Sequence, residues 1–360
     1  MKKILFLLLI FLPSGLSANH YSGEIESGIQ LNHPTASSVG AGLARFRLGA
    51  ELNTPHTNIR LHLRACTASG KSFFGSASLM APANAISVDP KELTLDQAYF
   101  SMEKGGAFFC IGLMDPAQFT PEHTGFFSLT LTGNESTQFL STHFLWLLAN
   151  NGLDQMVYQS LPAVFFGFRI TRNIRFRTGM TFGLASQHLF LRNSIPAELE
   201  FISSWLHVSL NAGFGDAHSS YTHKISPSYG FIVEKSLVRH LFVFVKGSIV
   251  EKDLKTYRTP DQQFSGDYLV AKEFSTFDKH ISTGICFQKE GRSAGIGYSR
   301  ASEFGRSEAE KVIEIYVRQK VLDTFDLTPD FQYIFHPNGN KNVSCMWIAG
   351  LRLYYPFDLI

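Results

Sequence analysis

The sequence predicts an all-β protein, a transmembrane antiparallel β-barrel of about 14 to 16 strands, and three observations support this prediction. Many segments alternate apolar and polar residues with a period of two, which places one set on each face of a strand. Charged residues make up only 17% of the chain, against roughly 25% in soluble proteins, while Phe and Gly are abundant. Beyond the first residues, no apolar run is long enough to cross a bilayer as a helix.

The start of the chain has the three parts of a secretory signal peptide. Lys2 and Lys3 precede an apolar run, and small residues follow up to Ala18. The apolar run is too short to span a bilayer, which takes about 20 residues. We therefore predict a signal peptide at residues 1–18, followed by one barrel domain at residues 19–360 in the bacterial outer membrane.

The clearest pair of strands lies within residues 312–335. Ile313 and Ile315 alternate there with Glu314 and Arg318, and a second alternating run follows. One face of this pair is aliphatic and aromatic, as lipid requires, whereas the other carries charges of both signs. Such a polar face suits the wall of a water-filled channel.

Similar segments recur along the whole chain, separated by clusters of Gly, Asn, Asp and Pro. The other predicted strands are residues 39–52, 57–65, 93–102, 107–114, 163–170, 174–181, 201–214, 228–234, 241–250, 281–287, 295–299 and 346–354. The predicted tight turns are Lys104-Gly105-Gly106 and Thr171-Arg172-Asn173. The predicted loops are residues 71–90, 115–134, 215–224 and 252–272, and residues 137–148 fit either a strand or a short helix.

Basic residues share one face in the clearest strands. An Arg that faced lipid at the middle of the bilayer would cost roughly 2 to 4 kcal/mol, so these side chains are expected to point inward. The side chains that we predict to line the lumen and contact the solute are Arg60, Arg64, Arg175, Arg177, Glu314, Tyr316, Arg318, Asp330 and Gln332.

Several motifs resemble the OprB-type carbohydrate-selective porins of bacterial outer membranes. The C-terminal motifs are Glu314-x-Tyr316-x-Arg318, Leu327-Thr328-Pro329-Asp330-Phe331-Gln332-Tyr333-Ile334, Pro337-Asn338-Gly339 and Gly350-Leu351-Arg352-Leu353. The weaker upstream motifs are Asp96-Gln97-Ala98-Tyr99 and Ile111-Gly112-Leu113-Met114-Asp115-Pro116. The resemblance implies a sixteen-stranded barrel that conducts sugars by passive diffusion, with arginines and carboxylates near its constriction.

This resemblance sets our expectations for partners. We expect small neutral carbohydrates as solutes, outer-membrane lipid around the barrel, a homo-oligomer, and no cofactor. Arg supplies a planar fork of hydrogen-bond donors and carboxylates supply acceptors, so a wall of both can exchange hydrogen bonds with sugar hydroxyls. A net charge of +2 argues against a nucleic-acid partner, which would require a basic surface.

Three other functions stay open at this point. The first is a general outer-membrane porin without sugar selectivity, and the second is a barrel enzyme of the lipase or protease type. The third is a surface-exposed structural or adhesive barrel, which would have long loops and little conductance. Gly291-Arg292-Ser293-Ala294-Gly295 matches the nucleophile elbow, but its flanks predict a hairpin turn instead of a strand followed by a helix. We predict no metal site, because His218 and His223 lie in a predicted polar loop. The four cysteines form no Cys-x-x-Cys and are expected to be buried or wall-facing thiols.

Overall fold

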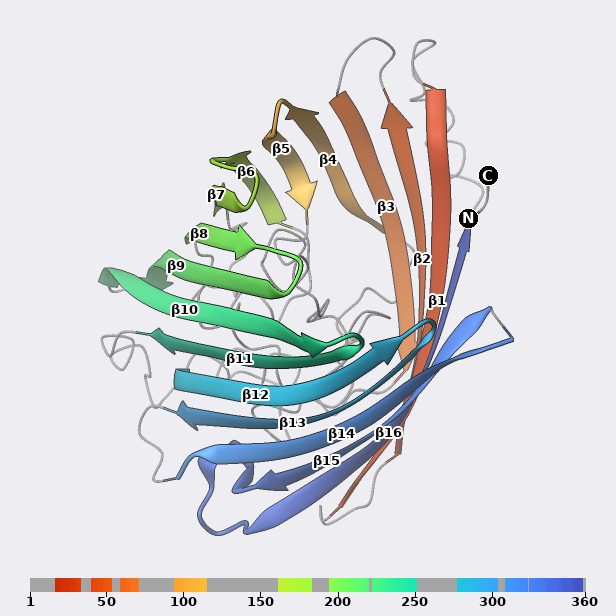
Figure 1. Ribbon diagram of the computed structural model, residues 1–360, viewed down its shortest axis with the longest axis vertical. Coiled ribbons are helices and arrows are strands. Elements are labelled where there is room, and N and C mark those ends of the chain that lie inside the picture. Colours follow the sequence, from red (N-terminus) through yellow and green to blue (C-terminus); the bar gives the residue numbers. More distant parts are fainter. Residues whose placement is uncertain are drawn as a thin grey trace.

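The computed structural model describes residues 17–33, 40–53, 59–70, 94–114, 161–182, 194–219, 222–250, 277–303, 308–322 and 324–358. These residues form a closed barrel of sixteen strands, numbered β1 to β16 along the chain (Figure 1). Each strand pairs with the strands before and after it in sequence, and β1 pairs with β16 to close the ring. The predicted fold class and strand number are therefore confirmed.

A tilted transmembrane strand needs about 9 to 11 residues. Within the described ranges, all strands except β5 and β7 have at least 9 residues, and those two have 8 each. The bounds of the strands are β1 Ser17–His33, β2 Gly40–Asn53, β3 Ile59–Gly70, β4 Thr94–Lys104, β5 Ala107–Met114, β6 Leu161–Arg169, β7 Ile174–Thr181, β8 Ser194–Ile202, β9 Leu206–Ser219, β10 Thr222–Val238, β11 Leu241–Val250, β12 Phe277–Lys289, β13 Arg292–Glu303, β14 Glu310–Val321, β15 Phe325–Phe335 and β16 Cys345–Asp358.

One end of the barrel carries the short connections that join β4 to β5, β6 to β7, β8 to β9, β10 to β11, β12 to β13 and β14 to β15. We call it the short-turn end. Gly105 and Gly106 make the turn between β4 and β5 with φ angles of 61° and 85°, a region that favours glycine. This turn and the predicted hairpin between β6 and β7 are confirmed.

The two faces of each strand differ as the alternation requires. Along β14 and β15, Ile315 and Phe331 are 47% and 43% exposed, whereas Glu314 and Gln332 are buried. Register places Ile315 opposite Phe331 and Glu314 opposite Gln332, so the apolar and polar rows continue from strand to strand. An exposed apolar row on a closed barrel faces lipid, and the polar row faces the lumen.

Two predictions along the chain are wrong. Residues 201–214 are not one strand, because β8 ends at Ile202 and β9 begins at Leu206. The Ser203 hydroxyl stabilises the turn between them by accepting from the Leu206 amide at 3.0 Å. Residues 215–224 do not form a loop either, since β9 and β10 extend into them and His223 lies opposite His218 in their register. The sequence prediction also missed β1 and β8.

Several predicted segments lie outside the described residues. They are the loops at 71–90, 115–134 and 252–272, the ambiguous segment at 137–148, and most of the signal peptide. The prediction that residues 1–18 form a signal peptide stays a prediction. Among the described residues, no helix has the length and apolar character needed to span a membrane.

Candidate functional site in the lumen wall

The nine predicted site residues belong to the polar rows of their strands, and the structure divides them between separate parts of the wall. Arg60 and Arg64 lie on β3, opposite Ser101 and Gln97 of β4. Arg175 and Arg177 lie on β7. The other five lie on β14 and β15, which are separated from β3 by β16, β1 and β2 and from β7 by β8 to β13.

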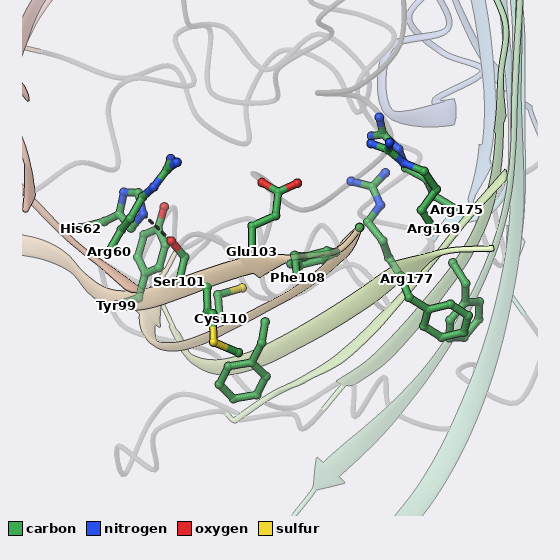
Figure 2. Close-up of a pocket in the computed structure, with 15 residues that line it drawn as sticks. Arg60, His62, Tyr99, Ser101, Glu103, Phe108, Cys110, Arg169, Arg175 and Arg177 are labelled. Atoms are coloured by element: carbon green, nitrogen blue, oxygen red, sulfur yellow. Dashed lines mark hydrogen bonds between the residues drawn. The ribbon is translucent and has the colours of Figure 1, made fainter. Parts of the chain in front are cut away.

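A cavity of about 360 Å³ opens on the wall formed by β3 to β7, near the short-turn end. Three of the predicted residues line it, namely Arg60, Arg175 and Arg177. Figure 2 shows Arg60 and His62 on one side of the cavity, the other two arginines with Arg169 on the far side, and Glu103 between them. The cavity therefore brings cationic side chains from both ends of this wall segment around one carboxylate.

On the β3 side, Glu51 of β2 holds the basic residues in place. Its carboxylate lies 3.3 Å from the Arg60 guanidinium and 3.8 Å from the His62 ring. The His62 ring also forms a hydrogen bond with the Ser101 hydroxyl at 2.7 Å and stacks on Tyr99, with ring centroids 4.5 Å apart. These contacts fix the ring of His62 and direct the more exposed Arg60 toward the cavity.

On the β7 side, the cations are held by a row of buried carboxylates on the next strands. Arg177 contacts Glu198 at 2.6 Å and Glu200 at 3.7 Å, both on β8. Arg175 lies 3.9 Å from Glu200. The two arginines lie directly opposite these two glutamates in the register of β7 and β8, so the backbone pairing itself sets the ion pairs.

The row continues onto β9 and β10 through a buried histidine. His207 lies between two carboxylates, with Nε2 at 3.0 Å from Glu200 and Nδ1 at 2.8 Å from Glu234. The Ser209 hydroxyl donates to Glu198 at 2.7 Å. Arginine, glutamate, histidine and serine side chains thus alternate as donors and acceptors across four neighbouring strands, and we call this set the Glu200 network.

The five predicted residues on β14 and β15 form a second polar area of the lumen face. Tyr316 lies opposite Asp330 in register, and Arg318 forms an ion pair with Asp326. Gln332 donates to Asp330 at 3.0 Å. Their arrangement mixes donors and acceptors as on the β7 side, but these residues do not line the cavity described above.

Exposure separates the nine candidates further. The side chains of Arg60 and Arg175 are 54% and 41% exposed, and Arg318 is 24% exposed. Tyr316 is only 1% exposed, because it packs with Phe244 and Cys286. Its ring is therefore covered in this structure, whereas the side chains of Arg60 and Arg175 are open to the cavity.

The sequence prediction missed several residues of this wall. Those around the cavity are His62, Tyr99, Ser101, Glu103 and Arg169, and those of the Glu200 network are Glu198, Glu200, His207, Ser209 and Glu234. A signal for the second set was present, because Glu198, Glu200, His207 and Ser209 alternate with apolar neighbours. The strand β8 that carries the two glutamates had not been predicted.

Two smaller predictions can be compared with the structure. Cys110 and Cys286 are buried thiols, as expected, and among the described residues neither they nor Cys345 form a disulfide. Ser293 lies in β13 directly after the hairpin turn at Glu290 and Gly291, which confirms the predicted hairpin at this motif. In the described part of the chain, no group of three or more His, Cys, Asp or Glu residues could hold a metal ion.

A closed sixteen-stranded barrel with an apolar outer face and a charged lumen face is the architecture of outer-membrane β-barrels. Residues 279–357, from β12 to the end of β16, match the sequence profile of the carbohydrate-selective porin, OprB family. This match confirms the resemblance that the C-terminal motifs indicate. No curated protein sequence gives a match to the chain.

Solved structures of porins share the fold of this chain at low sequence identity. The high-pH structure of OprB from Pseudomonas putida is 12% identical, with a TM-score of 0.67 over 99% of this chain and 97% of that one. An anion-selective porin from Comamonas acidovorans is 9% identical, with a TM-score of 0.61 over 95% of this chain and 100% of that one. OmpF from Salmonella typhi, in complex with daunomycin, is 8% identical, with a TM-score of 0.62 over 95% and 97%.

Proposed function

We propose that this porin is selective for carbohydrates and lets small neutral sugars diffuse passively through its lumen. The observation that carries this proposal is the match of residues 279–357 to the carbohydrate-selective porin family. These residues include Glu314, Tyr316, Arg318, Asp330 and Gln332, the predicted lumen residues of β14 and β15.

The chemistry of the wall supports the proposal on physical grounds. A sugar leaves its water contacts most readily where the wall offers both donors and acceptors in return. Arg60 and Arg175 offer exposed donors at the cavity, and Glu103 offers an exposed acceptor between them. Because Glu51, Glu198 and Glu200 offset much of the positive charge, a neutral polyol can approach without a strong field that favours ions.

Sugar binding in such a channel has to be weak, because a tightly held solute would block the path. Weak binding gives a direct test in a planar bilayer. Purified protein is reconstituted, ion current is recorded, and glucose or maltose is added in rising concentration. The proposal predicts a current that falls with sugar concentration and saturates. A current that falls only in proportion to solution viscosity would indicate a general porin without sugar selectivity.

The fold and the family match favour a channel over an enzyme. An outer-membrane barrel enzyme would turn over phospholipid or peptide substrates after purification. We expect the purified barrel to conduct ions and to leave both substrates intact. If the purified barrel turned over phospholipid or peptide, and lost this activity on denaturation, the protein would not be a porin alone.

A further inference from the structure

Arg169 and Arg175 form a pair of like charges on the cavity wall. They lie directly opposite each other in the register of β6 and β7, both on the lumen face. Like charges directly opposite on neighbouring strands are destabilising. Figure 2 shows the two side chains next to each other, with their guanidinium groups pointing the same way.

The hairpin that carries the pair is well fixed by hydrogen bonds. The amide of Ile170 donates to the Ile174 carbonyl at 2.8 Å, and the Thr171 hydroxyl accepts from the Ile174 amide at 3.1 Å. The turn between β4 and β5 also holds the hairpin, because the Arg169 amide donates to the Gly106 carbonyl at 2.9 Å. The two arginines are therefore placed together by rigid backbone, as a preformed site requires.

Nearby carboxylates offset this pair only in part. Arg177, two residues further along β7, is 11% exposed and takes the short contact with Glu198. Arg175 reaches Glu200 only at 3.9 Å, and that carboxylate also accepts from His207. Within the described ranges, Arg169 has no ion pair with a carboxylate, and Glu103 is the acidic residue that lines the cavity with it.

Two parallel guanidinium forks are suited to an oxyanion, because carboxylate and phosphate groups accept paired hydrogen bonds from Arg. An anion between the forks would also remove the like-charge repulsion. We propose that Arg169 and Arg175 bind the oxyanion group of a small solute, the carboxylate of a sugar acid or a phosphate. This inference goes beyond the passage of neutral sugars. It rests on the proposed function only because the solute has to reach the cavity through the lumen.

The test uses the full-length porin in planar bilayers at low potassium chloride concentration. Gluconate and inorganic phosphate are added separately as probes, and neutral glucose is the comparison solute. We expect at least one of the two anions to block the ion current with saturation, and to lose this effect as the salt concentration rises. Block by gluconate alone assigns the site to carboxylates, and block by phosphate alone assigns it to phosphate. Absence of block by both anions would overturn the proposal.

Three variants distinguish a specific anion-binding site from a general effect of the positive charges of the lumen. Arg169→Gln removes one fork, and we expect the concentration of anion needed for half-maximal block to rise by about tenfold. Arg169→Lys keeps the charge but not the paired donors, so it should weaken block while leaving ion selectivity close to that of the parent. Arg172→Gln removes the same charge from the exposed turn of the same hairpin and should leave block unchanged.

The outcomes distinguish this proposal from the proposed function. If glucose blocks the parent and neither anion does, the arginine pair is not an oxyanion site and the sugar proposal stands. If an anion blocks and glucose does not, the oxyanion site stands and the proposed selectivity for neutral sugars is wrong. The oxyanion site would be wrong if Arg172→Gln weakened anion block as much as Arg169→Gln. It would also be wrong if Arg169→Gln weakened block by glucose and anion equally.

Discussion

Arg318 is the residue of the β14 and β15 wall for which we expect an effect on ion selectivity. Its guanidinium pairs with Asp326 on the neighbouring strand, and its side chain is 24% exposed. Glu314 lies four residues away on the same face but is fully buried. The partly exposed cation, instead of the buried carboxylate, is therefore the charge that a passing ion meets here.

Replacing Arg318 with Gln should shift the ion selectivity of the channel toward cations, because Asp326 then loses its partner and adds a negative field to the lumen. The measurement is the reversal potential in a salt gradient. Arg292→Gln is the matched control, since Arg292 lies opposite Gln319 on the outer face and loses the same charge outside the lumen. Equal shifts in both variants would show that net charge, and not the lumen position, sets selectivity.

Glu200 has a structural role within the wall. Its carboxylate is fully buried and is shared by His207, Arg175 and Arg177. Removing one partner of a buried charge pair is costly because the other charges remain in a poorly solvated position.

We expect Glu200→Gln to lower the free energy of unfolding by about 3 kcal/mol, at the lower end of the range for such losses because Gln keeps some hydrogen bonds. The measurement is the urea midpoint in lipid vesicles. Glu290→Gln, in the exposed turn between β12 and β13, is the control that removes the same charge without breaking the network. If both variants unfold at the same urea concentration, the Glu200 network does not stabilise the barrel.

At the scale of elements, close packing between strands depends on glycine at particular places. Gly167 of β6 lies opposite Phe108 and Arg177, and a Cβ added there would lie 2.4 Å from the Phe108 ring and 2.6 Å from the Phe176 carbonyl oxygen. A backbone atom at that distance cannot move aside without shifting β7.

Gly167→Ala should therefore destabilise the barrel by about 1 to 3 kcal/mol, as overpacked sites generally do. Gly49→Ala is the control, because a Cβ there meets only the Ser22 hydroxyl at 3.1 Å, with backbone atoms no closer than 3.9 Å. Urea unfolding in vesicles measures both variants. Equal stability of the two would contradict the tight approach of β5, β6 and β7.

The strands with uninterrupted alternation could be predicted from the sequence, and β14 and β15 are the clearest examples. The strand β1 was missed because Gly23 and Ser27 interrupt the apolar row that Ile25, Ile29 and Leu31 form. In β8, Pro196 is a residue that normally argues against a strand.

The site could be predicted only in part, because its contacts depend on the register between strands. Inward arginines follow from the cost of charge in lipid, but nothing in the local sequence shows that His207 lies between Glu200 and Glu234. Exposure could not be predicted either. The burial of Tyr316 follows from its contact with Phe244 and Cys286, which are distant in the chain.

At the scale of the whole molecule, the outer face of the barrel contacts lipid. A charged side chain placed on this face should therefore lower folding stability, by an amount that depends on its depth in the membrane. Ile315, near the middle of β14, is 47% exposed on this face. Ile315→Arg should cost roughly 2 to 4 kcal/mol of folding stability in vesicles, whereas Gln319→Arg, closer to the turn, should cost at most about 1 kcal/mol.

Folding yield and urea midpoint in vesicles measure this pair of variants. Both substitutions introduce the same side chain on the outer face of the same strand, so the difference between them reports depth in the membrane. Equal penalties at the two positions would contradict the position of β14 across the hydrocarbon layer.

We propose that the lumen favours sugars beyond what their size allows. The measurement is permeation into liposomes that contain the purified porin, comparing a monosaccharide with a zwitterionic amino acid of similar size. The account predicts faster entry of the sugar, with a rate that saturates as its concentration rises, because exposed donors and acceptors of the wall hold it briefly. Equal rates for the two solutes, with no saturation for the sugar, would contradict the claim and leave a general porin.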